Sequence, residues 1–427
     1  MASRYEPILP RMFRSIPQLQ RLGEGWLTEM EAVARVLPFR ANRYVVDELI
    51  DWDKVPEDPL FQLVFPHREM LPEWAYAAVS GLLGSGAGEE QIAALVAKVR
   101  ASLNPHPGDQ VSGNTPQLDG EPVHGLQHKY RETVLFFPKS GQTCHAYCGF
   151  CFRWPQFTDE PSLRIALNED ERLGRYLRAH PEVTDVLVTG GDPLTMSARR
   201  LEQCLLRITA PELQHIANIR LGTKALTFWP QRFTTDSDAD ALLRLLESLV
   251  KKGKSVFIMM HVDHPVELQP EPTRKAIARL LSVGAQLRGQ APVLRHINDS
   301  ADVWSQLWQE EVKAGIAPYY MFVARDTGAR SRYDVSLARA LDIYRNAIQK
   351  VSGLARTARG PSMSTRFGKI EVQGVAEIGS ERVFSLSFLQ GRNPDWVKRP
   401  FFARYDEHAT WFDELRPAFG APRFFFE

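Results

Sequence analysis

Residues 168–189 predict a helix that is followed directly by a strand. They read Asn168-Glu-Asp-Glu-Arg-Leu-Gly-Arg-Tyr-Leu-Arg-Ala-His-Pro-Glu-Val-Thr-Asp185-Val-Leu-Val-Thr189. Asn168 suits a helix N-cap with Glu171 three residues later, and the apolar side chains that follow recur at helical spacing. The run Asp185–Thr189 is rich in valine and leucine, which predicts a short buried strand. The stretch is therefore one αβ unit.

The same pattern of a helix and then a strand recurs later in the chain. Helical patterns lie at Leu242–Leu249, Lys275–Leu281 and Val303–Val312, and strand-like runs follow at Ser255–Met260, Pro292–Leu294 and Tyr319–Val323. Thr133–Phe137 is an earlier candidate strand. Repeated alternation predicts an α/β fold with a parallel sheet and active-site groups at the carboxyl ends of its strands. An open sheet and a barrel both fit this pattern.

The segments on either side of the alternating core differ from it. Residues 1–115 show helical periodicity, at Leu22–Leu37, Glu73–Leu83 and Glu89–Leu103, and end in a Pro- and Gly-rich stretch. We therefore expect a helical accessory region over residues 1–115 and the core over residues 116–372. Residues 373–427 are expected to form a C-terminal extension, with a strand-like run at Arg382–Leu389 and an unassigned aromatic tail.

Composition excludes several classes of function. The 427 residues carry 52 Lys and Arg against 51 Asp and Glu, so the net charge of +1 gives no field for holding nucleic acid or an anionic membrane. Apolar runs fall far short of the roughly 20 residues that span a bilayer, and the first ten residues lack an apolar signal core. A cytoplasmic location without nucleic-acid or membrane partners is the expectation.

Three of the four cysteines lie within eight residues, in Cys144-His-Ala-Tyr-Cys148-Gly-Phe-Cys151. Such spacing lets one loop wrap a compact metal centre while backbone amides donate hydrogen bonds to the sulfurs. The alternatives are unligated cysteines or a structural zinc site that uses His145 or a distant residue as its fourth ligand. Structural zinc sites usually draw on two pairs of ligands, and the sequence offers no second pair.

The cysteine spacing, with Phe150 directly before the last cysteine, resembles the signature of the radical S-adenosylmethionine (SAM) superfamily. The resemblance implies a [4Fe-4S] cluster with one iron left open for SAM, and reductive cleavage of SAM to a 5'-deoxyadenosyl radical. The turn Gly190-Gly191-Asp192-Pro193, directly after a predicted strand, resembles the superfamily's segment for the amino group of SAM. Its glycines permit close approach of a ligand, and the carboxylate of Asp192 suits an ammonium group.

Further segments resemble the lysine 2,3-aminomutase family, which combines radical chemistry with pyridoxal 5'-phosphate. In chain order they are Asn42–Ile50, Pro56–Leu60, His128–Tyr130, the cysteine loop, Leu221–Thr223, Pro230–Phe233, His261–Pro265, Leu294–Asp299, Pro318–Tyr320 and Gly368–Ile370. The resemblance covers most of the chain. It implies a partial (β/α) barrel of the radical SAM type and an isomerase that moves an α-amino group to the β carbon.

The resemblance also assigns roles to single residues. Lys369 matches the lysine that holds the coenzyme as a Schiff base, which requires a pKa lowered by desolvation or by a cation such as Arg366. Arg153 matches the arginine that binds the substrate α-carboxylate, although it also suits neutralisation of the cysteine thiolates. The residues implied to lie near the coenzyme or SAM are Lys129, Tyr130, Phe150, Gly190, Gly191, Asp192, His261 and Gln290. Thr133 stands where the lysine enzymes carry a second basic residue.

Two departures from the lysine enzymes concern the substrate. Arg325 and Ser362 stand where those enzymes place two aspartates for the distant ammonium group. A cation in place of an anion repels lysine and attracts a carboxylate, so the pattern is closest to the glutamate 2,3-aminomutases. Asp326 adjoins Arg325, so a shift of one residue would restore an acidic ligand.

The sequence therefore predicts a 2,3-aminomutase that converts L-glutamate to β-glutamate. The alternatives are the same chemistry on lysine or another amino acid, and an iron–sulfur or zinc protein without radical turnover. The expected partners are the amino acid substrate and an electron donor such as flavodoxin or ferredoxin, while a homo-oligomer stays open. No cysteine follows Cys204, so the zinc-linked assembly of the clostridial-type enzymes is not expected.

Overall fold

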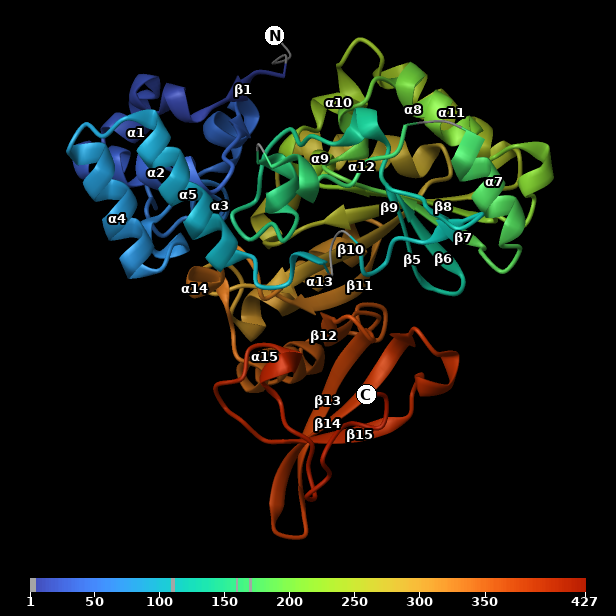
Figure 1. The fold of residues 1–427 in the computed structure, drawn as a ribbon. Helices are drawn as coiled ribbons and strands as arrows, with labels where there is room; N and C mark the ends of the chain where they lie inside the picture. The colour runs from blue at the N-terminus through green and yellow to red at the C-terminus, as the bar shows by residue number, and fades with distance from the viewer. Residues whose placement is uncertain (1–4, 109–111, 159, 169–170) are drawn as a thin grey trace.

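An eleven-stranded sheet forms the centre of the computed structural model, which describes residues 5–108, 112–158, 160–168 and 171–427 (Figure 1). The strands are β5 (Leu126–Tyr130), β6 (Thr133–Phe136), β7 (Asp185–Val188), β8 (Asn218–Thr223), β9 (Ser255–His261), β10 (Gln286–Val293), β11 (Ile316–Val323), β12 (Arg359–Ser364), β13 (Gly368–Ile378), β14 (Glu381–Gly391) and β15 (Pro400–Arg404). They lie side by side in chain order, from β5 at one edge to β15 at the other.

Strands β6 to β12 are parallel, and each is joined to the next through helices. The connecting helices are α7 (Glu171–Ala179), α8 (Ala198–Leu206), α9 (Ala225–Phe228), α10 (Gln231–Thr234), α11 (Ala239–Lys251), α12 (Glu271–Ser282), α13 (Ala301–Lys313), α14 (Arg330–Tyr333) and α15 (Leu337–Gln349). Serine side chains cap α8, α13 and α15, because Ser197, Ser300 and Ser336 each accept a hydrogen bond from the first turn. Strands β5 and β13 to β15 pair antiparallel at the two ends of the sheet.

Alternation along the parallel strands separates two faces of the sheet. Side chains such as Val186, Ile219 and Ile258 point toward the helices and are fully buried in the main core. The alternate positions are only partly buried in β7 and β8, so they line an inner face. The sheet curves far enough for β14 to contact β5, and the inner face is thereby enclosed in a partial barrel.

The N-terminal part is mostly helical and lies to one side of the sheet (Figure 1). It contains β1 (Pro7–Ile8), α1 (Pro17–Gln20), α2 (Glu24–Val36), β2 (Ala41–Asn42), α3 (Pro59–Val64), α4 (Glu73–Gly84) and α5 (Glu89–Leu103), and a small hairpin, β3 (Gln117–Leu118) and β4 (Glu121–Pro122), follows. Its core continues into Ala146, Trp154 and Tyr333. The N-terminal helices therefore pack directly against the loop that carries the cysteines.

The C-terminal segment continues the sheet. β13 runs from Gly368 to Ile378 and so passes through the expected boundary at residues 372–373. Phe401, Phe424 and Phe426 are buried in a separate aromatic core beside β13 and β14, so the aromatic tail folds back onto the chain itself. The division into three regions remains a prediction.

The expected α/β fold with a mostly parallel sheet is confirmed, and β5 and β15 remain its two open edges. The strand expected near Pro292–Leu294 begins earlier, at Gln286. Its apolar pattern is interrupted by polar residues on the inner face and by Gly289, which packs against Glu311 of α13. Helix α7 begins at Glu171, and the two residues after the expected N-cap Asn168 lie outside the described residues. No helix within the described ranges is both long and apolar enough to cross a membrane.

Candidate active site

The cysteine loop leaves the carboxyl end of β6 and is held in place by the N-terminal part. The Tyr147 amide donates to the Arg40 carbonyl at 2.8 Å, and the Gly149 amide donates to the Leu63 carbonyl at 2.7 Å. The Arg40 guanidinium donates to the Thr143 hydroxyl at 2.7 Å and to the Cys144 carbonyl at 2.9 Å. Contacts from the N-terminal part therefore fix the conformation of the loop.

The three thiols lie in a buried environment. Burial raises the pKa of Cys144, Cys148 and Cys151, and for Cys144 the charges of Asp192 and of the other two cysteines add to the effect. Three thiolates here consequently need a cationic centre beside them. The three thiols are free and close enough for their charges to act on one another. The donor set fits a centre such as a [4Fe-4S] cluster.

Gly149 occupies a position where no side chain fits. A Cβ added there would collide with the Tyr333 hydroxyl and would come within 2.8 Å of the Met70 Cε. The Tyr333 hydroxyl donates to the Gln62 carbonyl at 2.7 Å, so it is not free to move away. Close packing against α14 and the N-terminal part thus fixes the loop between Cys148 and Cys151.

The turn Gly190-Gly191-Asp192 lies at the carboxyl end of β7 and packs on the start of the cysteine loop. A Cβ on Gly191 would collide with the backbone of Thr143, to whose carbonyl the Asp192 amide donates at 2.7 Å. The Asp192 carboxylate accepts hydrogen bonds from the Thr223 hydroxyl at 2.7 Å and from the Lys224 amide at 3.0 Å. It therefore joins the cysteine loop to the end of β8, in addition to its expected role toward SAM.

The Asp192 carboxyl stays ionised despite its burial. Burial raises its pKa, but His145, whose Nε2 lies 3.2 Å from Oδ2, and the hydroxyl of Thr223 outweigh that effect and lower the pKa. The site therefore keeps a fixed negative charge next to the cysteine loop.

Phe150, His261 and Gln290 come together at the carboxyl ends of β9 and β10. The Phe150 and His261 rings stack with centroids 5.5 Å apart, and Gln290 is the register partner of His261. The Asp263 carboxylate lies 3.4 Å from His261 Nδ1. These three residues, distant in sequence, thus lie beside the cysteine loop, as expected for residues around SAM.

Sequence reasoning missed Lys224, which lies just after β8. Its ammonium donates to Asp263 at 2.8 Å and to Glu267 at 2.6 Å, and both carboxylates are fully buried. Burial lowers the pKa of Lys224, but these two carboxylates and Cys148 outweigh burial and raise it above its ordinary value. In the sequence, the only indication of a functional role was the position of this lysine, directly after the Gly-Thr pair that ends a strand.

Lys369 lies at the other end of the site, near the start of β13. Its Nζ is 3.8 Å from the ring centroid of Tyr320 and 4.7 Å from that of Phe322. Burial lowers its pKa well below the ordinary value, and the cations of Arg220, Arg359 and Lys129 lower it further. The lowered pKa favours the neutral, nucleophilic amine, which Schiff-base chemistry requires.

The cations around Lys369 differ in part from those expected. Arg359 lies over the rings of Tyr320 and Tyr319 at 4.3 and 4.6 Å, while Arg220 is 3.8 Å from Asp185. Lys129 donates to the Thr365 carbonyl in the turn before Lys369. The Arg366 guanidinium lies over Phe367 instead, and it is not among the cations that act on Lys369. The position of Arg220, a charged residue in the middle of a strand, was the overlooked indication of a role in the site.

Arg153 and Arg325 lie close enough to affect each other. Burial lowers the pKa of Arg153 to about 10; Cys151 opposes this effect and Arg325 reinforces it. Both guanidinium groups border the ring of Phe152, at 4.9 Å for Arg153 and 5.3 Å for Arg325. The position of Arg153 beside Cys151 leaves both of its expected roles open.

Two further expected residues, Tyr130 and Ser362, lie on β5 and β12. The Tyr130 side chain is near Ser364 and Arg325, and burial raises its pKa to about 12. Ser362 is fully buried and donates to the Met321 carbonyl at 3.5 Å. It shares a strand face with Ser364, the register partner of Lys369.

Comparisons with known proteins give the family. A putative L-lysine 2,3-aminomutase of Aquifex aeolicus is 31% identical over 397 residues, which cover 93% of this chain and 92% of the relative. The chain belongs to the lysine 2,3-aminomutase family of radical SAM enzymes. The L-lysine 2,3-aminomutase of Escherichia coli K12 is 30% identical over 250 residues, 57% of this chain and 68% of that protein. No family model matches the chain.

Structural neighbours of this aminomutase are distant. A radical SAM methyltransferase from Sphaerobacter thermophilus covers 69% of this chain and 92% of its own, at 13% identity and a TM-score of 0.38. Family membership makes the chain a radical SAM aminomutase, an isomerase whose CxxxCxxC cysteines serve a [4Fe-4S] cluster that acts with SAM. The rival of a binding protein without radical turnover is not supported.

Proposed function

We propose that this aminomutase uses pyridoxal phosphate and acts on an amino acid with a carboxylate side chain, L-glutamate being the first candidate. The substrate assignment rests on the pair Arg153 and Arg325, whose guanidinium groups both border the ring of Phe152. Two cations suit a substrate with two carboxylates, since a guanidinium binds a carboxylate through two parallel hydrogen bonds. A lysine side chain would place a third cation beside them.

The surroundings of Lys369 fit pyridoxal phosphate. A neutral buried amine is available for the aldehyde, aromatic rings lie beside it, and Lys129, Arg220 and Arg359 supply positive charge for a phosphate dianion. Arg220 and Arg359 would take the place of the second basic residue that Thr133 replaces. When bound, the coenzyme supplies a π system that delocalises an unpaired electron beside the migrating nitrogen.

The chain's own groups then divide the remaining work. Arg153 orients the α-carboxylate, and Arg325 holds the side-chain carboxylate at the far side of Phe152. Asp192, with Phe150, His261 and Gln290, borders SAM beside the cysteine loop. We include a one-electron donor of the flavodoxin or ferredoxin class in the proposal, because cleavage of SAM is reductive.

Lysine is the second candidate, and it is favoured by the relatives from Aquifex aeolicus and Escherichia coli, which are named as lysine 2,3-aminomutases. Its main structural support would be Asp326, if that residue pointed toward the substrate. The Asp326 carboxylate instead lies 3.5 Å from His106, whereas the neighbouring Arg325 borders Phe152, Arg153 and Tyr130. The pocket charge therefore favours an acidic substrate.

The test is product formation by anaerobically reconstituted enzyme with SAM, dithionite and either glutamate or lysine, followed by mass spectrometry of β-amino isomers. We expect β-glutamate from the native chain, and a loss of about 100-fold or more in kcat/KM for glutamate in Arg325→Asp, because a like charge then faces the substrate. Arg366→Gln is the matched control. β-Lysine as the product, or unchanged glutamate kinetics in Arg325→Asp, would contradict the substrate assignment.

A further inference from the structure

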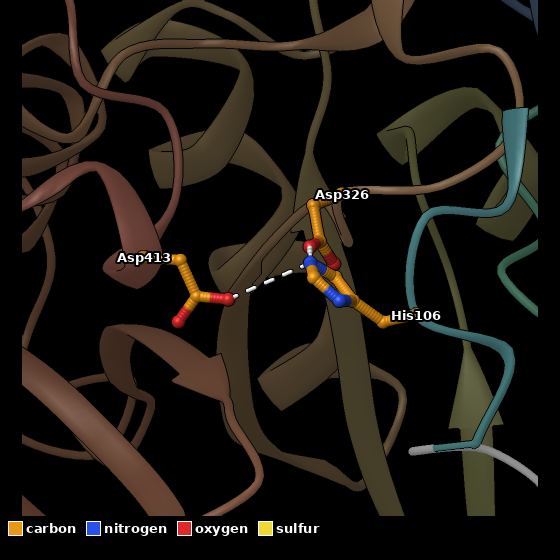
Figure 2. Close-up of side chains that lie close together, drawn as sticks. All are labelled: His106, Asp326 and Asp413. Carbon is orange, nitrogen blue, oxygen red and sulfur yellow. Dashed lines mark ion pairs between the residues drawn. The ribbon is translucent and has the colours of Figure 1, made fainter. Parts of the chain in front are cut away.

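Three side chains from distant parts of the sequence meet beside the substrate-binding region. His106 follows α5 of the N-terminal part, Asp326 lies in the loop after β11, and Asp413 belongs to the C-terminal segment (Figure 2). His106 Nε2 is 3.5 Å from an Asp326 oxygen and 3.7 Å from an Asp413 oxygen, and the three donor atoms all lie within 4.8 Å of one another.

These distances are longer than those of good hydrogen bonds but shorter than those between groups that do not interact. An N–H to oxygen bond spans about 2.7–3.2 Å, so His106 bonds well to neither carboxylate. Around a tetrahedral ion with ligand bonds of about 2.0–2.2 Å, neighbouring donor atoms lie roughly 3.3–3.6 Å apart. The geometry therefore resembles the edge of a coordination shell more closely than a hydrogen-bonded cluster.

Asp326 gives an independent indication of a missing partner. Its side chain is only 10% exposed, and Figure 2 shows its carboxylate aimed at the His106 ring. Burial raises the pKa of Asp326, and the charges of Arg325 and His106 together with the hydrogen bond from its own backbone amide do not outweigh that effect. A buried carboxylate without better partners is costly, and a bound cation would compensate it.

The backbone near the cluster is already fixed. The Thr327 hydroxyl and the Gly328 amide donate to the Leu103 carbonyl, at 3.0 and 2.9 Å, so the loop of Asp326 is tied to the end of α5, close to His106. The Trp154 indole N–H also donates to Thr327, at 3.1 Å. The backbone would therefore need to move little for the three side chains to coordinate an ion.

We propose that His106, Asp326 and Asp413 bind a divalent metal ion, with solvent completing the coordination. One imidazole and two carboxylates suit a borderline ion such as Zn²⁺, with Mn²⁺ as a weaker occupant. The ion would join the N-terminal part, the Arg325 loop and the C-terminal segment at one point. This site is separate from the cysteine loop, and the proposal does not depend on the substrate or on pyridoxal phosphate.

The experiment uses cluster-loaded enzyme, freed of loosely bound metal and titrated with Mn²⁺. Loss of the free Mn²⁺ resonance signal reports binding, and Zn²⁺ is then added as competitor. We expect one saturable Mn²⁺ site per chain that Zn²⁺ empties. Asp326→Asn and His106→Ala should weaken binding at least about tenfold.

The matched control is His408→Ala, which removes an exposed histidine from the same C-terminal segment and should bind like the native chain. Iron content and far-UV circular dichroism show that each variant is folded, and Zn²⁺ should raise the melting temperature of the native chain but not of Asp326→Asn. Absence of a saturable site, or equal binding by Asp326→Asn, would overturn the proposal. A lower melting temperature in His106→Ala without any metal effect would leave an ion-pair cluster only, and would also overturn it.

Discussion

The two ends of the active site are built in opposite ways. The cysteine end is one short loop, and its shape is imposed by hydrogen bonds from Arg40 and Leu63. The lysine end is assembled from β5, β8, β11, β12 and β13, each of which contributes one or two side chains. The cysteines of the first end are therefore contiguous in sequence, although distant residues hold their loop, whereas the residues of the second end are brought together only by the folded sheet.

Their charges are opposite as well. The three thiols at the cysteine end are buried, so their thiolate forms need a cationic centre beside them. Burial of Lys369 among Lys129, Arg220 and Arg359 makes the other end a place where positive charge needs an anion. An iron cluster at one end and, as proposed, a coenzyme phosphate at the other would satisfy these two needs, so each end should respond to its own substitutions.

The largest expected effect is at the cysteine end. Cys148→Ala should lose most of the bound iron and all measurable 5'-deoxyadenosine formation, because two thiolates do not hold the cluster. The same variant should still bind pyridoxal phosphate if the two ends are independent. Cys204→Ala, which truncates a buried cysteine of α8, is the control and should keep its iron. Full iron content in Cys148→Ala would remove that residue from the ligand set.

The mirror experiment is at the lysine end. Lys369→Ala should lose the visible absorbance band of the bound coenzyme and the isomerisation, while its iron content stays native. Lys251→Ala, on the exposed face of α11, should change neither. An unchanged absorbance band in Lys369→Ala would show that another amine holds the coenzyme.

A smaller effect is expected where the loop is most tightly packed. Gly149→Ala should destabilise the protein by about 1–3 kcal/mol, because the new methyl group collides with Tyr333 and Met70. Thermal unfolding and iron retention measure this effect. Gly81→Ala is the matched control: it lies in α4 with open space around it and should be neutral or stabilising. Equal stability of the two variants would mean that the loop yields easily.

The smallest effect concerns pH. Lys369 binds an aldehyde only when its amine is neutral, and the neutral fraction falls as the pH drops through its pKa. The Arg359 cation lowers that pKa, so Arg359→Gln should raise it and shift the appearance of the absorbance band upward by about half to one pH unit. Pyridoxal without phosphate is the appropriate probe, because it separates this effect from loss of a phosphate contact. An unchanged midpoint, or an equal shift in Arg366→Gln, would contradict it.

The sequence predicted the framework closely wherever local periodicity was strong. α5 spans the expected Glu89–Leu103, and β9 begins at the expected Ser255. β10 was largely missed, because Arg288 and Gln290 on its inner face and Gly289 on its helix-facing side interrupt its apolar pattern. Polar residues that line a functional site interrupt the apolar pattern of a strand. A search for apolar runs therefore misses such a strand.

The site was predictable to the extent that it was local or matched the family. The thiols and the glycine turn are contiguous motifs, and the structure brings them together with Phe150, His261 and Gln290. Arg220 and Arg359 were not found: Arg220 is a charged residue in the middle of a strand, but nothing in the sequence indicates that β8 and β12 converge on Lys369. Arg366, the sequence neighbour, was expected in their place, because proximity in sequence was the only available guide.

The position of Lys369 at the start of β13 has a consequence for the order in which the enzyme matures. The buried core beneath the cysteine loop draws on no residue beyond Tyr333. Lys369, in contrast, depends on β13, whose antiparallel partner β14 ends only at Gly391. During synthesis from the N-terminus, the iron-binding end can therefore close while the coenzyme end is still emerging from the ribosome.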